Sequence, residues 1–502
     1  MTIHEPASLS TLPPEIILYI LSHLDMKNDW FSLAMACRRV STVAVPELDK
    51  YNATLGRNYA FWYACVLNNP VMLLRHISID ATIVNRHFTH NFLHQKTKSM
   101  FGRSMSPLTV AIKAGQGGIV QLLLANGADA NLPDQAPAPK SLVLWYPINW
   151  AVASHHEDSV AIIGMLKNHS ANLDQVPKDW RVKVAEYPKG MKCAPIFRLL
   201  LLDKPRRKSW HTTQLTSCEM YNDDFKKIQD LRLRQLKALL EGGADPNKRY
   251  DWDYVTPVFF LLTSLANYKP EFYFPDRLML SHEKEAQASM VNDIVASFLN
   301  TLRDFGAYTH GLGNTYFYKE RLAREISVQF PETPLHTACR LNDLHKPLIY
   351  WFLRNRSNIN TLGKADNSPL MAYCDSDFKD MYQFRKFLKR RPNINQRDMH
   401  HWTALHCLCA NRRLQSQVKE QAVRMMLNMG ADPTAVHKDG KTPADEIPVD
   451  KPPKRQGSAN ETESPSNSYD PHHAMREMLH DAAKEWEERR NKGRQQLSLK
   501  PK

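Results

Sequence analysis

The chain has 502 residues, and none of its apolar runs approaches the roughly 20 residues that a membrane-spanning helix needs. We therefore expect no membrane association. The first residues lack the basic region, apolar stretch and cleavage site of a secretory signal, which predicts a cytoplasmic location, a nuclear one or both. Cysteine is sparse, and its 8 scattered copies predict reduced thiols inside helices rather than a disulfide framework.

Signatures of catalysis are also missing. The sequence has no glycine-rich phosphate loop, no nucleophile elbow and no metalloprotease helix. His400, His401, His406, Cys407 and Cys409 have the residue types of a zinc site, but the two cysteines fall on different faces of their expected helix and no second ligand pair accompanies them. We predict a protein that is not an enzyme and that has no catalytic residue, metal or cofactor.

Basic residues outnumber acidic ones, 66 against 52, which gives a formal net charge of +14. A nucleic-acid site needs such charge to be clustered, and the clusters at 204–208 and 385–391 are short. No zinc finger, RNA-recognition signature or helix-turn-helix pattern accompanies them. We therefore do not expect nucleic-acid binding, and a solvated basic face or an acidic protein partner remain as interpretations.

One short pattern does recur, most clearly as Thr333-Pro334-Leu335-His336. The Thr333 hydroxyl can accept from the first N–H groups of a helix, and proline suits its first position because no N–H is needed there. The pattern therefore predicts a helix that starts at Pro334. Similar marks begin at residues 106, 146, 194, 256, 368, 403 and 442.

A second mark closes each unit, namely an apolar run followed by a tight turn, as at 122–129, 239–245, 305–307 and 429–432. Glycine in this turn permits the left-handed residue that ends a helix. Ser170, Arg356 and Arg391 stand where the glycine would be. Because a left-handed non-glycine residue costs about 1 kcal/mol, we expect these turns to be looser or closed differently.

These two marks, recurring in the same order, resemble the ankyrin repeat family, whose unit is two short antiparallel helices and a protruding loop. The resemblance covers 59–447 and implies an all-α solenoid with long insertions near 81–105, 203–230 and 268–290. The second helix after the 203–230 insertion is expected at 231–240. The motif histidines, His336 and His406, are expected to bridge neighbouring loops.

Residues 11–50 carry a different pattern. A Leu-Pro-Pro-Glu opening at residue 12 precedes an apolar stripe at helical spacing, and a second helix follows with Leu-Ala-x-x-Cys-Arg-Arg at 33–39. This segment resembles the F-box, which docks on a small adaptor subunit of SCF-type cullin–RING ubiquitin ligases. A helical cap on the repeat array is the other interpretation. By position, the resemblance implies adaptor contacts at Leu12, Pro13, Ile16, Ile20 and Leu24.

The two resemblances together indicate an F-box protein with C-terminal ankyrin repeats, of the fungal type. They imply a substrate receptor whose F-box binds the ligase adaptor and whose repeats bind an unknown target protein. A scaffold or inhibitor that is not linked to ubiquitination is the alternative. Target contacts are expected at Phe272, Tyr273, Phe274, Arg206 and Arg390, with an acidic ligand; a buried aromatic cluster at 272–274 is the other interpretation.

The ends of the chain have little pattern. Residues 1–10 are expected to form a mobile leader, and 448–470 a disordered linker, because that stretch is too polar to fold alone. A last helix with a basic tail is expected within 471–502. Its apolar side, which includes Met475 and Leu479, is expected to cover the open end of the repeat stack.

Overall fold

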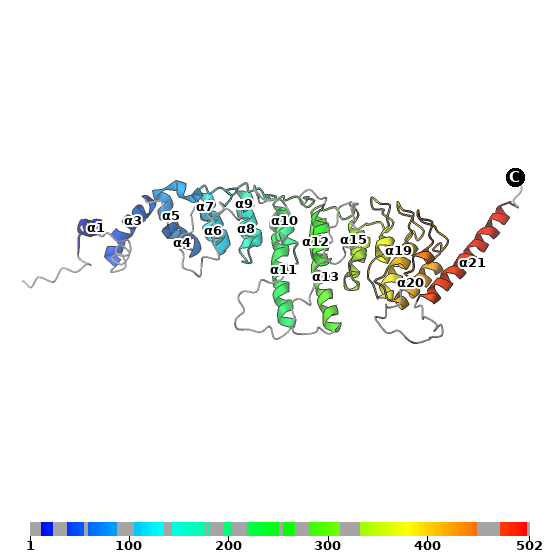
Figure 1. Ribbon diagram of the computed structural model, residues 1–502. Helices are drawn as coiled ribbons and strands as arrows, with labels where there is room; N and C mark the ends of the chain where they lie inside the picture. The colour runs from blue at the N-terminus through cyan, green and yellow to red at the C-terminus, as the bar shows by residue number, and fades with distance from the viewer. Residues whose placement is uncertain are drawn as a thin grey trace, which may run out of the picture. The chain divides into compact units, whose positions relative to one another are not determined.

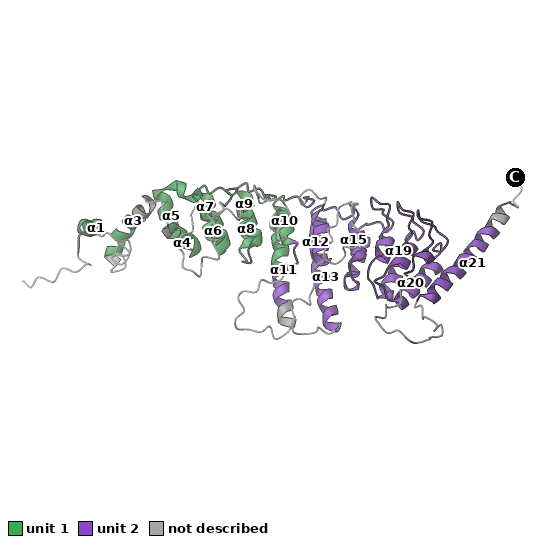
Figure 2. Cartoon of the chain, viewed as in Figure 1, with its two compact units in different colours: residues 1–199, 230–245 green, residues 200–229, 246–502 purple. Residues whose placement is uncertain are grey.

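The computed structural model (Figure 1) describes residues 12–23, 38–54, 59–87, 105–134, 143–176, 178–179, 194–202, 218–249, 255–266, 281–311, 332–448 and 472–498. The chain divides into two compact units (Figure 2): unit 1 comprises 1–199 with 230–245, and unit 2 comprises 200–229 with 246–502. The described elements are helical apart from one short antiparallel pair, so the all-α class is confirmed. In that pair Val143 lies opposite Asp179, and Leu144 lies opposite Lys178.

Unit 1 starts with the F-box-like helices and continues as helix pairs. Its elements are α1 (Pro14–Ser22), α3 (Arg38–Thr54), α4 (Tyr59–Val66), α5 (Pro70–Ile79), η1 (Ala81–Asn85), α6 (Pro107–Ala114), α7 (Gly117–Ala125), β1 (Val143–Leu144), α8 (Pro147–Ala153), α9 (Ser159–Asn168), β2 (Lys178–Asp179), α10 (Pro195–Leu199) and the last part of α11 (Cys218–Glu241). The first helix of each pair packs on the next, α4 on α6, α6 on α8 and α8 on α10. Small buried residues such as Ala111 and Ala151 allow this close approach.

Unit 2 continues with the same kind of pair. Its elements are the start of α11, α12 (Pro257–Ala266), α13 (Ser281–Asp304), α15 (Pro334–Arg340), η4 (Asp343–His345), α16 (Pro347–Arg354), α17 (Pro369–Cys374), α18 (Met381–Leu388), α19 (Ala404–Ala410), α20 (Ser416–Asn428), η5 (Pro443–Glu446) and α21 (His473–Ser498). Here α12, α15, α17, α19 and η5 pack in succession. Buried Met475 and Leu479 mark the inner side of α21, which contacts η5 and α20 and so covers the end of the stack as expected.

The recurring Pro mark does define the helix starts. Helices α6, α8, α10, α12, α15 and α17 begin at the proline of each mark, and α19 begins at the corresponding Ala404. Ser106 Oγ accepts from the N–H of Thr109 at 3.3 Å, and Ser368 Oγ accepts from the N–H of Met371 at 3.3 Å. These caps satisfy N–H groups that the helix itself leaves without partners, which is why short helices can start at these points.

Two insertions are shorter than expected, because their helices start earlier. Helix α11 begins at Cys218 rather than near residue 231, and α13 begins at Ser281, inside the range 268–290. In α11 the apolar spacing extends back to buried Phe225, and in α13 Ala288, Val291 and Val295 continue the buried stripe of the repeat. The helices therefore extend N-terminally beyond the length of an ordinary repeat. Residues 203–217 and 267–280 lie outside the described residues.

Two of the three closing turns without glycine are built like those with glycine. At Gly127, which has φ 85°, the N–H of Ala128 donates to Leu123 O at 3.0 Å. Ser170 has φ 59°, and the N–H of Ala171 donates to Leu166 O at the same 3.0 Å. At Arg356 the same bond runs from Ser357 N to Phe352 O at 3.1 Å, so the expectation was wrong for Ser170 and Arg356. Arg391 is followed by Pro392, which has no N–H for this bond, so that turn is closed differently, as expected.

Replacing Ser170 by glycine is expected to stabilise unit 1. The left-handed backbone of Ser170 costs about 1 kcal/mol, and part of this gain is offset by the greater freedom of glycine in the unfolded chain. We expect the free energy of unfolding to rise by about 0.5 kcal/mol. Urea unfolding of the two proteins measures the difference, and a loss of stability would show that the Ser170 side chain stabilises this turn.

Asparagine side chains join the loops of successive repeats. Asn85 Nδ2 donates to Gly127 O at 2.9 Å while its Oδ1 accepts from Asp129 N at 2.7 Å. The same paired contacts recur from Asn131 to Ser170 O and Asn172 N in unit 1, and from Asn395 to Gly430 O and Asp432 N in unit 2. Each amide therefore fixes the closing turn of the next repeat, and the loops keep a constant register.

Candidate protein-interaction site

The first helix is held by a small apolar core. Ile17 and Leu21 of α1 pack with Val40 and Ala44 of α3, and none of the four is more than 2% exposed. Residues 17 and 21 are one helical turn apart, and so are 40 and 44, so each helix contributes one narrow face. Helix α3 also contacts α4 and α5, which attaches the F-box-like part to the first repeat within unit 1.

The outer side of α1 is apolar as well. Ile16 is 45% exposed, Leu18 40% and Tyr19 64%, while Ile20 is half-buried. Ile16, Tyr19 and Ile20 are three and four residues apart, so they form one stripe beside the buried face. Three large apolar side chains exposed on a nine-residue helix are typical of a surface that binds another protein.

The predicted adaptor contacts fall on both sides of this helix. Pro13 and Ile16 are exposed and Ile20 is half-buried, whereas Leu12 packs against the core. Leu24 lies outside the described residues. The exposed side chains of Leu18 and Tyr19 were not among the predicted contacts, although the place of Tyr19 opposite Ile17 and Leu21 on a helical wheel was a usable signal.

The motif histidines join the loops of successive repeats. His336 Nδ1 lies 2.8 Å from Thr333 Oγ1 and 3.3 Å from Thr333 N, and its Nε2 lies 3.0 Å from Asn367 O in the next loop. The Thr333 hydroxyl contacts the ring of His336, and the two residues form a capping box at the start of α15. The bridging role expected of His336 is confirmed.

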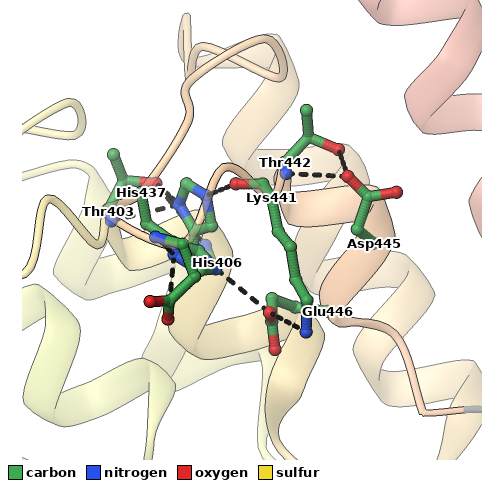
Figure 3. Close-up of polar contacts among 8 residues, drawn as sticks. Thr403, His406, His437, Lys441, Thr442, Asp445 and Glu446 are labelled. Atoms are coloured by element: carbon green, nitrogen blue, oxygen red, sulfur yellow. Dashed lines mark hydrogen bonds and ion pairs between the residues drawn. The ribbon is translucent and has the colours of Figure 1, made fainter.

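His406 makes the same bridge near the end of the array (Figure 3). Its Nδ1 lies 2.8 Å from Thr403 Oγ1, and its Nε2 lies 3.3 Å from Lys441 O. Burial lowers the pKa of His406, which keeps the ring neutral and able to accept at Nδ1. His437 then contacts Glu446 Oε1 at 3.1 Å, so this polar cluster joins consecutive loops.

The predicted target contacts are only partly visible. Arg390 is exposed just beyond α18. Arg206, Phe272, Tyr273 and Phe274 lie outside the described residues. The two repeats around Arg390 carry further exposed basic residues, which are considered below.

The described residues carry neither a metal-ligand cluster nor a membrane-spanning helix. Within those ranges, no three His, Cys, Asp or Glu side chains are grouped as metal ligands. No helix in the same ranges has both the length and the apolar character to cross a bilayer. The described cysteines, at 65, 339, 374, 407 and 409, are free, and burial raises the pKa of the Cys339 thiol to about 12. They are therefore packing residues rather than nucleophiles.

Comparison with known protein families agrees with both parts of the fold. An F-box-like family model matches residues 9–48, and the ankyrin repeat model matches residues 104–135. The first match spans α1 and the start of α3, and the second spans α6, α7 and the loop that Asn131 belongs to. No curated protein is significantly similar in sequence. An F-box-like domain followed by an ankyrin repeat in one chain points to a protein-interaction adaptor.

Proposed function

We propose that this protein is the substrate receptor of an SCF-type cullin–RING ubiquitin ligase. In this role the outer face of α1 binds the small adaptor subunit, and the ankyrin repeats bind the protein to be modified. The observation that carries the proposal is the exposed stripe of Ile16, Tyr19 and Ile20 beside the buried pair Ile17 and Leu21. A cap on the repeats would need a polar outer face at these positions.

The receptor would contribute no catalytic residue. The ubiquitin-charged partner supplies the chemistry, while the receptor raises the local concentration of the target and orients one of its lysines. A direct connection supports this role, since α3 contacts α1, α4 and α5 within unit 1. Such a receptor would act in the cytoplasm, the nucleus or both, where these ligases work.

Replacing Ile16 by aspartate is expected to weaken adaptor binding at least tenfold. Burial of one large aliphatic side chain is worth about 1.5–3 kcal/mol, and every 1.4 kcal/mol changes affinity about tenfold. Because Ile16 is exposed and outside the core of Ile17 and Leu21, the helix itself should remain folded. Titration of the purified full chain with the adaptor measures the change, and adding Pro13→Ala should weaken binding further.

The matched control is Val71→Asp, which makes the same kind of change at a 66% exposed apolar residue of α5, outside α1. It should leave adaptor binding unchanged. If Ile16→Asp binds the adaptor as well as the natural chain does, the outer face of α1 is not the docking surface and the receptor function is wrong. The alternative, a scaffold or inhibitor, predicts that other proteins co-purify with the full chain while the adaptor does not.

A further inference from the structure

Two neighbouring repeats of unit 2 end their second helices in exposed basic residues. We call Arg354, Arg356, Lys389, Arg390 and Arg391 the arginine row. All five side chains are exposed, and none forms an ion pair within the described part of unit 2, where the basic partners are others such as Arg303, Arg340 and Arg424. Cations are favoured at helix C-termini, but exposed charges without an acidic partner are free to bind one from outside.

The two halves of the row are held side by side. Tyr350 of α16 donates its hydroxyl to Gln383 O of α18 at 3.2 Å, and Lys386 Nζ lies 4.1 Å from the centre of the Tyr350 ring. Beyond the helices, Asn393 N donates to Asn360 Oδ1 at 2.7 Å. The closing turns at Arg356 and Arg391 therefore occupy equivalent places in adjacent repeats. Packed helices are about 8–10 Å apart, which sets the spacing between the two halves.

The backbone gives a second, independent reason to single out this row. Arg356 has φ 68° and Arg391 has φ 56°, whereas the equivalent turns of other repeats use Gly127, Gly243, Gly306 and Gly430, with Ser170 as one further exception. A left-handed conformation disfavours arginine, and the fold alone would favour glycine at both places. Strained residues that persist where a simpler one would serve are concentrated at sites of function. Both strained residues here are long cations on one surface.

The row is only two repeats wide. On one side of the row, Arg303 forms an ion pair with Asp304 at 2.7 Å and donates to Asn355 Oδ1 at 2.6 Å. The charge of Arg303 is therefore already neutralised by Asp304. On the other side, the next closing turn contains Met429 and Gly430, which carry no charge. A nucleic-acid strand gains affinity from a longer track of phosphate contacts. A short acidic stretch of polypeptide matches the row better.

We propose that the arginine row binds an acidic, extended segment of the target protein, with carboxylates at every third position. An extended chain in the polyproline II conformation has three residues per turn and advances about 3.1 Å per residue, so carboxylates three residues apart lie on one side, about 9 Å apart, and can reach both halves of the row. The guanidinium of arginine can bind a carboxylate through two parallel hydrogen bonds. This inference rests on the proposed receptor function, because the segment belongs to the captured protein.

The test uses the full chain and a short fluorescent peptide with glutamate at every third position. Replacing Arg356 and Arg391 together by glycine is expected to weaken peptide binding roughly tenfold, since two exposed ion pairs are lost. The same change should leave the midpoint of thermal unfolding unchanged or higher, because glycine relieves the left-handed backbone. Arg356→Lys with Arg391→Lys should lose only part of the binding, because it keeps both charges but not the two parallel hydrogen bonds of each guanidinium.

Two control variants separate charge from backbone effects. Ser170→Gly makes the same backbone change without removing a charge, and Lys226→Ala with Lys227→Ala removes two exposed charges from α11; neither should alter peptide binding. Unchanged affinity in the double glycine variant, or equal binding of a glutamine version of the peptide, would overturn the proposal. Tighter binding of a single-stranded oligonucleotide that is lost in the same variant would assign the row to nucleic acid and would equally overturn it.

Adaptor binding measured on the same preparations separates this inference from the receptor function. If the adaptor binds and the peptide does not, the arginine row is wrong and the receptor function stands. If the peptide binds and the adaptor does not, the surface is real but it belongs to a scaffold rather than a ligase receptor.

Discussion

Replacing Arg340 by alanine is expected to lower the free energy of unfolding of unit 2 by about 3–5 kcal/mol, because a buried carboxylate then loses its cation. The Glu332 side chain is 3% exposed, and both of its oxygens accept from the Arg340 guanidinium. Burial would raise the pKa of Glu332, yet Arg340, with help from Asn367, holds that pKa below its usual value. The charged pair also links two repeats, since Asn367 Nδ2 donates to Glu332 Oε1 at 2.5 Å.

The double variant Glu332→Gln with Arg340→Met is the control for this prediction. It removes both charges while keeping the volume, so most of the lost stability should return. Urea unfolding at neutral pH measures the natural chain and both variants. A cost below about 1 kcal/mol for Arg340→Ala would mean that water reaches Glu332 and that the pair behaves like an exposed one.

Local chemistry explains what the sequence could predict of the fold. A proline after a capping residue determines where α6, α15 and α17 begin, whatever surrounds them, because the cap and the missing N–H act within one turn. The bridging role of His336 was predictable for a related reason. Its motif position fixes the ring beside Thr333, and the next loop always passes near its other nitrogen.

Features that depend on distant contacts could not be predicted in this way. Lys346 is fully buried, although a lysine between a polar bend and a helix would be assigned to the surface from sequence. Its Nζ donates to Cys339 O at 2.5 Å and to Ser376 Oγ at 2.7 Å, so it caps the end of α15 within its own repeat and binds Ser376 of the next repeat. Burial lowers its pKa to about 8. The Ser376 contact crosses 30 residues of sequence and needs the assembled repeats.

In the candidate site, too, local sequence predicts some features and distant contacts decide the others. The apolar stripe of α1 was visible as helical spacing, but only the packing of α3 decides that Ile17 and Leu21 face inward and that Ile16 and Tyr19 face outward. The arginine row could not be recognised from charge alone. The adjacency of Arg356 and Arg391 depends on the stacking of α16 beside α18, and the left-handed backbone at both residues was not expected.

Acidification from neutral pH to about 4 is expected to cost unit 2 about 3 kcal/mol for each of two buried histidines. Burial lowers the pKa of His336 to about 4, against the opposing charge of Glu332, and burial lowers the pKa of His345 to about 4 as well. The unfolded chain protonates these rings near pH 6.5. Between pH 6.5 and 4 the unfolded state therefore binds more protons, so the free energy of unfolding falls as the pH falls through that window.

Substitutions at one motif position test the role of the histidines in this pH dependence. His336 is the third residue of α15, and Met371 holds the same position in α17 of the next repeat. His336→Met should remove about half of the loss measured between pH 6.5 and 4, at some cost in stability at neutral pH for the lost bridge to Asn367. Met371→His should add a loss in the same window. Urea unfolding at several pH values measures all three proteins. If the free energies of unfolding of the three proteins depended on pH in parallel throughout the window, His336 would titrate alike in the folded and unfolded chain. The loss of stability would then come from carboxylates that protonate at lower pH.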